Sequence, residues 1–146
     1  MEIKNNKQIG EMGERIAIGE LSKYGLEILL PMGDNLPFDF VVYTNNKFYK
    51  CQVKTTYENT KNGSCRFSLT SNNWATKKVH KYNNEEVDVI ICCDLKHIYL
   101  FSFSEVKNKS NIFLRDEPTK NGQVKGINLK KDYILTEERI LKIFSN

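Results

Sequence analysis

Apolar residues at helical spacing mark the first part of the chain. Three small or apolar residues follow Glu14 at offsets of three, seven and eleven: Ala17, Leu21 and Gly25. This spacing predicts a helix over Gln8–Tyr24 that ends at Gly25. A second apolar set lies on another side of the same helix: Ile9, Met12 and Ile16. We therefore expect a sheet on one side and another cover, such as a second subunit, on the other.

Strand-like runs separated by turn residues come next. Leu26–Leu30 is a short predicted strand that Pro31 closes. Two longer runs, Phe38–Thr44 and Lys47–Lys54, are separated by the pair Asn45-Asn46. Asparagine tolerates the positive φ angles of a tight type I′ turn, so these runs are predicted to form a hairpin with a two-residue turn.

The second half of the chain predicts further strands and one more helix. Val87–Cys93 is almost continuously apolar, which is typical of a central strand buried on both faces. Ile98–Phe103 is its predicted neighbour across the turn at Asp94–His97. The remaining predicted elements are a third pairing strand at Cys65–Thr70, a helical or irregular segment at Ser71–Asn83, short strands at Ile112–Leu114 and Val124–Leu129, and a helix at Thr136–Phe144. With no repeat and no linker, residues 1–146 are predicted to form one α/β domain.

Composition and charge narrow the class of protein. The apolar content is 40% and the charged content 27%, as in ordinary globular proteins. No apolar run approaches the ~18 residues that span a bilayer, and the first residues lack the apolar core of a signal peptide. We therefore expect a cytoplasmic protein with no membrane partner. The net charge of +4 is compatible with a nucleic-acid partner but does not establish one.

Cysteine and histidine offer little catalytic signal. The four cysteines do not form Cys-x-x-Cys pairs and lie in apolar or strand-like runs: Cys51, Cys65, Cys92 and Cys93. Small buried thiols are the expected state, with neither a zinc site nor a disulfide framework. His80 and His97 lie outside any nucleophile or metal-ligand spacing and are expected at the surface and in a turn.

The predicted hairpin brings three polar side chains together. If Asn45 and Asn46 form the turn, residues whose numbers sum to 91 face each other, so Asp39 opposes Gln52. Opposed Cβ atoms lie about 4.5–5.5 Å apart. Lys54 shares a face with Gln52 because side chains alternate along a strand. The hairpin therefore predicts one patch that holds a carboxylate, an amide and an ammonium group.

These three groups suit the hydrolysis of a phosphodiester. Mg²⁺ prefers oxygen ligands such as carboxylates, completed by water and substrate phosphate. A bound metal polarises the phosphoryl oxygen and acidifies a coordinated water molecule. A nearby lysine can orient or deprotonate that water, or stabilise charge in the transition state.

The same residues carry a family resemblance. Pro37-Phe38-Asp39, Gln52-Val53-Lys54 and the helical pair Gly13-Glu14 resemble the PD-(D/E)XK nuclease superfamily. The pattern looks closest to the small homing endonucleases of bacterial group I introns, whose third motif has glutamine in place of the acid. The resemblance covers mainly Gly10–Thr56.

The resemblance implies a restriction-endonuclease-like core, a mixed central sheet flanked by helices, and Mg²⁺-dependent cleavage of double-stranded DNA, with Mn²⁺ as a substitute. It implies that Asp39 is the principal metal ligand, Gln52 a neutral oxygen ligand and Lys54 the catalytic lysine. Glu14 would be an accessory ligand. Helix geometry also leaves Glu11 and Glu20 open, and Glu14 is favoured by the resemblance and by its stripe. The missing acid at Gln52 leaves an inactive relative as an alternative.

DNA contacts and assembly are further expectations. The candidate DNA-binding residues are Thr55, Lys77, Lys78 and Lys81, with Trp74 beside them. A weaker candidate patch consists of Lys120, Lys125, Lys130 and Lys131. One small domain reads few base pairs, so a site-specific enzyme is expected to be a homodimer or homotetramer. Alternatives are a Holliday junction resolvase-like nuclease, a restriction-type enzyme and a non-catalytic DNA-binding module.

Overall fold

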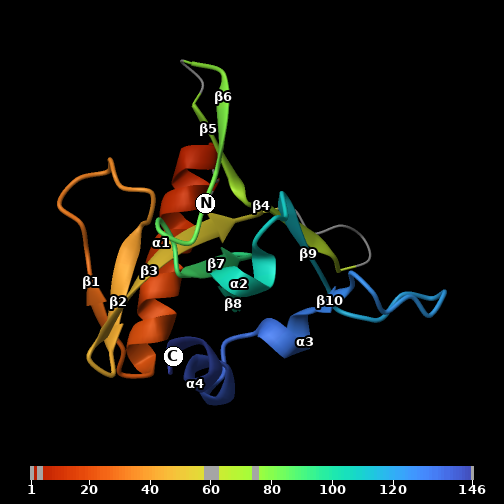
Figure 1. The fold of residues 1–146 in the computed structure, drawn as a ribbon. Helices are drawn as coiled ribbons and strands as arrows, with labels where there is room; N and C mark the ends of the chain where they lie inside the picture. The colour runs from red at the N-terminus through yellow and green to blue at the C-terminus, as the bar shows by residue number, and fades with distance from the viewer. Residues whose placement is uncertain (1, 3–4, 58–62, 74–75, 146) are drawn as a thin grey trace.

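A five-stranded sheet forms the centre of the molecule in the order β1-β2-β3-β7-β8 (Figure 1). The computed structural model describes residues 2, 5–57, 63–73 and 76–145. The strands of this sheet are Glu27–Leu29, Phe40–Thr44, Lys47–Thr55, Val89–Cys93 and Ile98–Ser102. β3 and β7 run parallel, and the other neighbours run antiparallel. The predicted mixed central sheet is therefore confirmed.

Strand β7 is buried over its whole length, as its continuous apolar run predicts. Val89, Ile91 and Cys93 belong to the core cluster on one face of the sheet. Ile90 and Cys92 belong to the cluster on the other face. Because successive side chains point to opposite faces, a strand covered on both sides needs apolar residues at every position.

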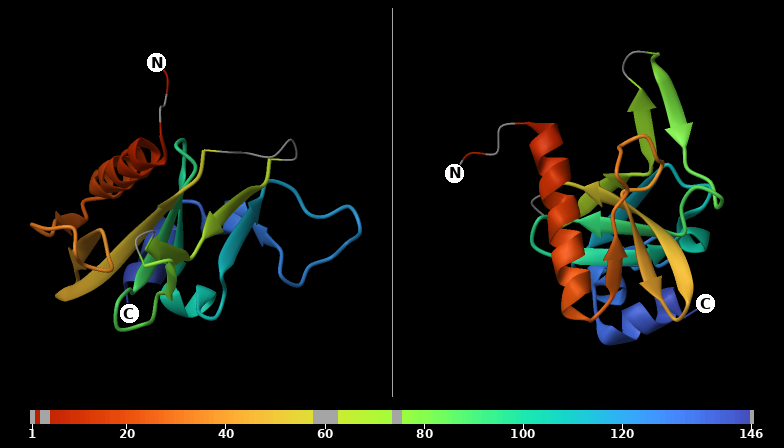
Figure 2. Two further views of the ribbon diagram at one scale, coloured as in Figure 1. Left: turned by 90° about the horizontal axis from the view of Figure 1, so that it is seen from above. Right: turned by 90° about the vertical axis from the view of Figure 1, so that its left-hand side faces the viewer.

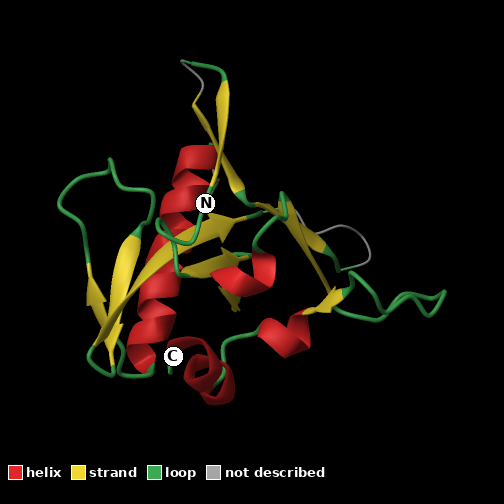
Figure 3. Ribbon diagram, viewed as in Figure 1, coloured by secondary structure: helices red, strands yellow, loops and turns green. Residues whose placement is uncertain are grey.

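Different layers cover the two faces of the sheet (Figure 2, Figure 3). Helices α1 (Asn6–Lys23) and α4 (Glu137–Phe144) pack on the first face. A three-stranded sheet packs on the second face in the order β10-β9-β4 (Asn128–Leu129, Asn111–Arg115 and Cys65–Ser68). Two short helices, α2 (Phe103–Val106) and α3 (Lys130–Tyr133), also contribute side chains to this second cluster.

Helix α1 has defined signals at both ends. The side chain of Asn5 accepts a hydrogen bond of 2.9 Å from the N–H of Gln8, so the helix begins at Asn6, two residues before the predicted start. Gly25 has φ of +76°, a conformation that suits glycine, and its N–H donates to the carbonyl of Ser22. The predicted stop at Gly25 is confirmed.

The segment Ser71–Asn83 differs from its prediction. In place of a helical or irregular segment, an antiparallel hairpin forms from β5 (Thr70–Asn73) and β6 (Lys78–Lys81). We call this hairpin the ribbon; it projects away from the body of the molecule (Figure 1, Figure 2). Every residue of β6 is exposed, so neither face carries the apolar alternation that reveals a strand in a sequence. Trp74 lies outside the described residues.

Other boundaries also differ. Cys65–Thr70 was expected as a strand that pairs beside the hairpin, but β4 covers only Cys65–Ser68 and pairs with β9 in the second sheet. The free edge of β3 is instead taken by β7. The strand predicted at Val124–Leu129 is shorter in the structure and covers only Asn128–Leu129. The short helices α2 and α3 were not predicted. The sequence also predicts a polar loop at Glu58–Gly63, most of which lies outside the described residues. Among the described helices, none is both long and apolar enough to cross a membrane.

Candidate active site

The candidate site lies where β3 continues beyond its neighbour β2. The β2–β3 ladder ends at the pair Phe40–Cys51, while β3 runs on to Thr55. Beyond that pair, the N–H of Val53 donates to Oδ2 of Asp39 at 2.7 Å. A buried backbone donor must find a partner, and here a side chain takes the place of the missing strand. Strand β2 therefore begins at Phe40, later than predicted, and the carboxylate is fixed at the open edge of β3.

The predicted register across the hairpin is confirmed. Asn45 and Asn46 have φ of 53° and 60°, and Thr44 pairs with Lys47. Asp39 and Gln52 lie one pair beyond the ladder, and Nε2 of Gln52 donates to Oδ2 of Asp39 at 2.8 Å. The same nitrogen also lies 3.3 Å from the carbonyl oxygen of Val53. The amide nitrogen thus lies between two oxygen atoms.

Lys54 lies near this pair, but its ammonium group has other partners. Its Nζ donates to the hydroxyl of Tyr82 at 3.0 Å and to the carbonyl of Thr70 at 3.2 Å. Burial raises the pKa of Asp39, and the Val53 N–H, the Lys54 ammonium and the Gln52 amide each act to lower it. Lys54 therefore acts electrostatically on Asp39 without a direct ion pair between them.

Glu14 reaches the site because α1 packs closely on β3. A Cβ atom at Gly13 would lie 1.9 Å from Oγ1 of Thr55, so only glycine permits this approach without a shift. Burial, and next the negative charge of Asp39, raise the pKa of Glu14 from 4.5 to about 7. Of the two other candidates, Glu20 pairs with Lys23 at 2.7 Å and Glu11 is exposed. Glu14 is therefore the helical acid that faces Asp39.

A cleft of about 410 Å³ opens beside these groups. Its lining includes Glu14 from α1 and Lys54 and Thr55 from β3. The Glu14 carboxylate makes no hydrogen bond with any described residue, and Oδ1 of Asp39 likewise accepts none from the part of the chain that the structure describes. Two carboxylates that repel each other, each with an uncommitted oxygen atom, favour the binding of a cation between them.

The donor set fits a hard divalent cation. It comprises the two carboxylates, the Val53 carbonyl oxygen and the Gln52 amide, which are oxygen ligands of the kind that Mg²⁺ prefers. In the present orientation Gln52 points its nitrogen at Asp39, so ligation through Oε1 requires a flip of the amide. No group of three His, Cys, Asp or Glu side chains suited to a metal occurs among the described residues. Among the described residues, a cation held by Asp39 and Glu14 would therefore need its remaining ligands from neutral groups such as Gln52, the Val53 carbonyl or water.

The candidate DNA-binding residues lie in two different settings. Thr55 packs against Gly13 of α1 and also lines the cleft. The three lysines of the ribbon are exposed: Lys77, Lys78 and Lys81. In the second predicted patch, Lys130 is paired with Asp116 at 3.1 Å and is mostly buried. Exposed lysines of this patch remain at positions 120, 125 and 131.

The remaining sequence candidates have structural surroundings. All four cysteines are free, buried thiols, and burial raises their pKa, to about 11 for Cys65. His80 lies 2.8 Å from a carboxylate oxygen of Glu86. His97 lies in a turn where its backbone N–H donates a hydrogen bond to Oδ1 of Asp94. None of these residues lines the cleft beside Glu14.

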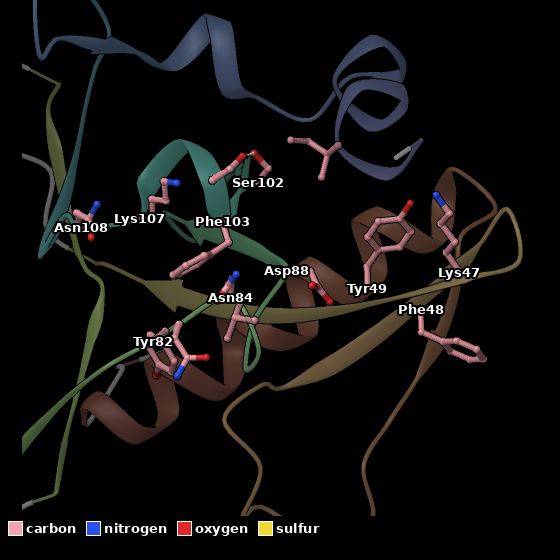
Figure 4. A pocket seen from close by; sticks show the side chains of 14 residues that line it. Lys47, Phe48, Tyr49, Tyr82, Asn84, Asp88, Ser102, Phe103, Lys107 and Asn108 are labelled. Carbon is pink, nitrogen blue, oxygen red and sulfur yellow. Dashed lines mark hydrogen bonds between the residues drawn. The ribbon is translucent and has the colours of Figure 1, made fainter.

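Thr70 and Tyr82 were not among the site residues predicted from the sequence. Both are partners of Lys54 and lie at the base of the ribbon; Thr70 was expected at the end of a strand and Tyr82 in a helical or irregular segment. Tyr82 also lines a larger cleft of about 950 Å³, together with Phe103 and Asp88 (Figure 4). A contact between β3 and the end of β6 depends on tertiary structure, so local patterns do not predict it.

Comparisons with known proteins address the family and the fold of the chain. A model of the PD-(D/E)XK endonuclease family matches residues 4–136. The solved structure of a bacterial homing endonuclease, I-Ssp6803I, is similar, with a TM-score of 0.68 and 21% sequence identity over 96% of this chain and 94% of that one. At this identity the likeness shows the fold alone, and no curated protein matches the chain in sequence. Because the family match spans nearly the whole sequence, the chain belongs to the PD-(D/E)XK endonuclease family.

Proposed function

We propose that this chain is a Mg²⁺-dependent endonuclease that cuts double-stranded DNA at specific sites, with residues 1–146 as one nuclease domain. The observation that carries the proposal is the convergence of Asp39, Gln52 and Glu14 beside Lys54 at the open edge of β3. The fold shared with a bacterial homing endonuclease supports the site-specific type of enzyme.

Each group has a distinct task in this proposal. Asp39 and Glu14 would hold Mg²⁺, with Mn²⁺ as a substitute, and Gln52 would add its amide oxygen after a flip. When bound, the cation supplies polarisation of the phosphoryl oxygen and a more acidic water molecule. The Lys54 ammonium then stabilises negative charge that develops on the phosphate or orients the attacking water.

The ribbon is the proposed DNA-contacting element. A two-stranded antiparallel ribbon fits the major groove of B-form DNA. Lys78 and Lys81 lie on one of its strands and Lys77 lies at its turn, all exposed to solvent. Their positive charges suit phosphate oxygens, which fix the position of a protein on the duplex. Thr55, which lines the cleft, is proposed as a closer contact to the scissile strand.

Cleavage of both strands requires two such sites. Because the strands of a duplex are antiparallel, two copies related by a twofold axis would each cut one strand, and we propose a homodimer or a dimer of dimers. Apolar side chains exposed on the loop between β1 and β2 support this assembly: Leu30, Met32 and Leu36. Sedimentation equilibrium measures the mass directly, and a monomer at all concentrations would contradict this part of the proposal.

A substrate panel tests the proposed activity. A library of duplexes with a randomised stretch and a four-way DNA junction are each incubated with wild type, Asp39→Ala and Lys54→Ala in Mg²⁺, Mn²⁺ or chelator, and new DNA ends are sequenced. We expect ends at a restricted set of duplex sequences, only with a cation and only with wild type. Preferential cutting of the junction would indicate a structure-selective resolvase instead.

A non-catalytic DNA-binding module is the second candidate function. The neutral Gln52, and the lack of a three-acid cluster among the described residues, favour it. The same panel, with duplex binding measured in each condition, separates the two. A binding module would bind duplexes equally with chelator and with Mg²⁺ and would produce no new ends.

A further inference from the structure

The ammonium group of Lys54 is bound at the base of the ribbon, where the chain enters β5 and leaves β6. Thr70 is the first residue of β5 and pairs with Lys81, the last residue of β6. Tyr82 follows Lys81 directly. Nζ donates to the Thr70 carbonyl at 3.2 Å and to the Tyr82 hydroxyl at 3.0 Å, so the first residue of β5 and the residue after β6 each supply one acceptor to the same cation.

Tyr82 is held firmly enough to act as a fixed acceptor. Its ring packs against the core cluster on the second face of the sheet. The His80 ring meets it edge-on at a centroid distance of 5.8 Å, and His80 itself lies 2.8 Å from the Glu86 carboxylate. The Lys54 Nζ also lies 4.8 Å from the centre of the Tyr82 ring, within the range of a cation–π interaction.

These contacts decide where a flexible side chain places its charge. Lysine carries a compact charge on a four-carbon stem and loses rotamer freedom when it is fixed. Without the two acceptors, the ammonium could pair with Asp39, whose carboxylate already interacts with it electrostatically. A direct ion pair between them would occupy the carboxylate that the proposed Mg²⁺ site needs.

We propose that Tyr82 is a positioning residue, whose hydroxyl, together with the Thr70 carbonyl, holds the Lys54 ammonium at the base of the ribbon and away from direct pairing with Asp39. The proposal rests on the proposed nuclease function. It adds that the element expected to contact DNA also holds the proposed catalytic lysine. A ribbon seated on DNA would therefore keep Lys54 beside the cleft while Asp39 stays free for the cation.

The test is a double-mutant cycle with Tyr82→Phe, Lys54→Ala and the double variant, with Tyr24→Phe as a control at an exposed tyrosine of the helix end. Phenylalanine keeps the ring and removes the hydroxyl acceptor. Mg²⁺ affinity is measured by calorimetry without DNA, and the single-turnover cleavage rate is measured at saturating DNA and Mg²⁺.

We expect Tyr82→Phe to weaken Mg²⁺ binding and to slow single-turnover cleavage, each by about tenfold, as for a lost hydrogen bond to a charged group. The DNA dissociation constant stays unchanged. In the Lys54→Ala background, which is expected to cut no DNA, the same substitution leaves the Mg²⁺ affinity unchanged, because it acts through Lys54.

Two results would overturn the proposal. One is an equal loss in both backgrounds, which means that Tyr82 acts without Lys54. The other is an unchanged Mg²⁺ affinity in Tyr82→Phe. If wild type binds Mg²⁺ but cuts no DNA, the proposed function fails, and the calorimetric cycle alone still decides the role of Tyr82.

Discussion

The contact between Gly13 and Thr55 gives a quantitative prediction about how the site is held together. In Gly13→Ala, the added Cβ would lie 1.9 Å from Oγ1, 2.8 Å from Cγ2 and 2.9 Å from Cβ of Thr55. Rotation of the threonine side chain moves the first two atoms but leaves the third, so α1 must shift away from β3. Forced overpacking of this kind costs about 1–3 kcal/mol.

Gly19→Ala is the matched control, because nothing lies within 4 Å of a Cβ at that position of the same helix. Alanine favours a helix over glycine by about 1 kcal/mol, and this gain is common to both variants. The free energy of unfolding of Gly13→Ala is therefore expected to be about 1–3 kcal/mol below that of Gly19→Ala.

Urea unfolding measures this difference. Mg²⁺ calorimetry gives a second readout, because a displaced α1 moves Glu14 and should weaken Mg²⁺ binding in Gly13→Ala but not in Gly19→Ala. Thr55→Ala in the Gly13→Ala background is expected to restore part of the lost stability, since it removes two of the three crowded atoms. Equal stability of the two alanine variants would refute the close helix–strand contact.

Three further predictions concern charge. Because the pKa of Glu14 is raised from 4.5 to about 7, the native state holds the proton more tightly, and the free energy of unfolding is expected to fall as the pH rises between these values. In Glu14→Gln this fall should be absent, which urea unfolding at several pH values will measure. A parallel fall in both proteins would contradict the assignment of the raised pKa to Glu14. The double variant Lys78→Ala/Lys81→Ala should weaken DNA binding and reduce, by about 2, the slope of the logarithm of the binding constant against the logarithm of the salt concentration. The control Lys142→Ala on α4 should leave the affinity and the slope unchanged. Equal effects of the two variants would argue against the ribbon as the DNA contact. Gln52→Glu supplies a third carboxylate, so this variant should bind Mg²⁺ more tightly in calorimetry. In chelator it should unfold more easily, because the added negative charge lies beside Asp39. An unchanged Mg²⁺ affinity would place Gln52 outside the metal site.

The hairpin register was predictable because it depends only on local sequence. Two asparagines fix the turn, and the period of two then pairs Asp39 with Gln52. The structure adds what the register does not contain: Asp39 also serves as the backbone partner of Val53 where β2 stops. The strand β7 was predictable for a similar reason, since burial on both faces leaves a continuous apolar run.

The ribbon and its contact with Lys54 were not predictable. An exposed hairpin has no buried face, so its sequence shows no alternation of apolar and polar residues. The acceptors Thr70 and Tyr82 are 16 and 28 residues from Lys54 in the sequence, and only tertiary structure brings them together. The close approach of α1 to β3 was likewise not predictable, because it depends on the single residue Gly13 and its contact with Thr55.

The central claim is that Asp39 at the open edge of β3 is required for cleavage of DNA. It is tested most directly by the single-turnover cleavage rate of Asp39→Asn on the preferred duplex in saturating Mg²⁺, with Asp34→Asn, at an exposed loop residue, as the control. Loss of several kcal/mol of charge stabilisation predicts a rate about 1000-fold below wild type for Asp39→Asn and an unchanged rate for Asp34→Asn. A rate for Asp39→Asn within a few-fold of wild type would contradict the assignment of the site.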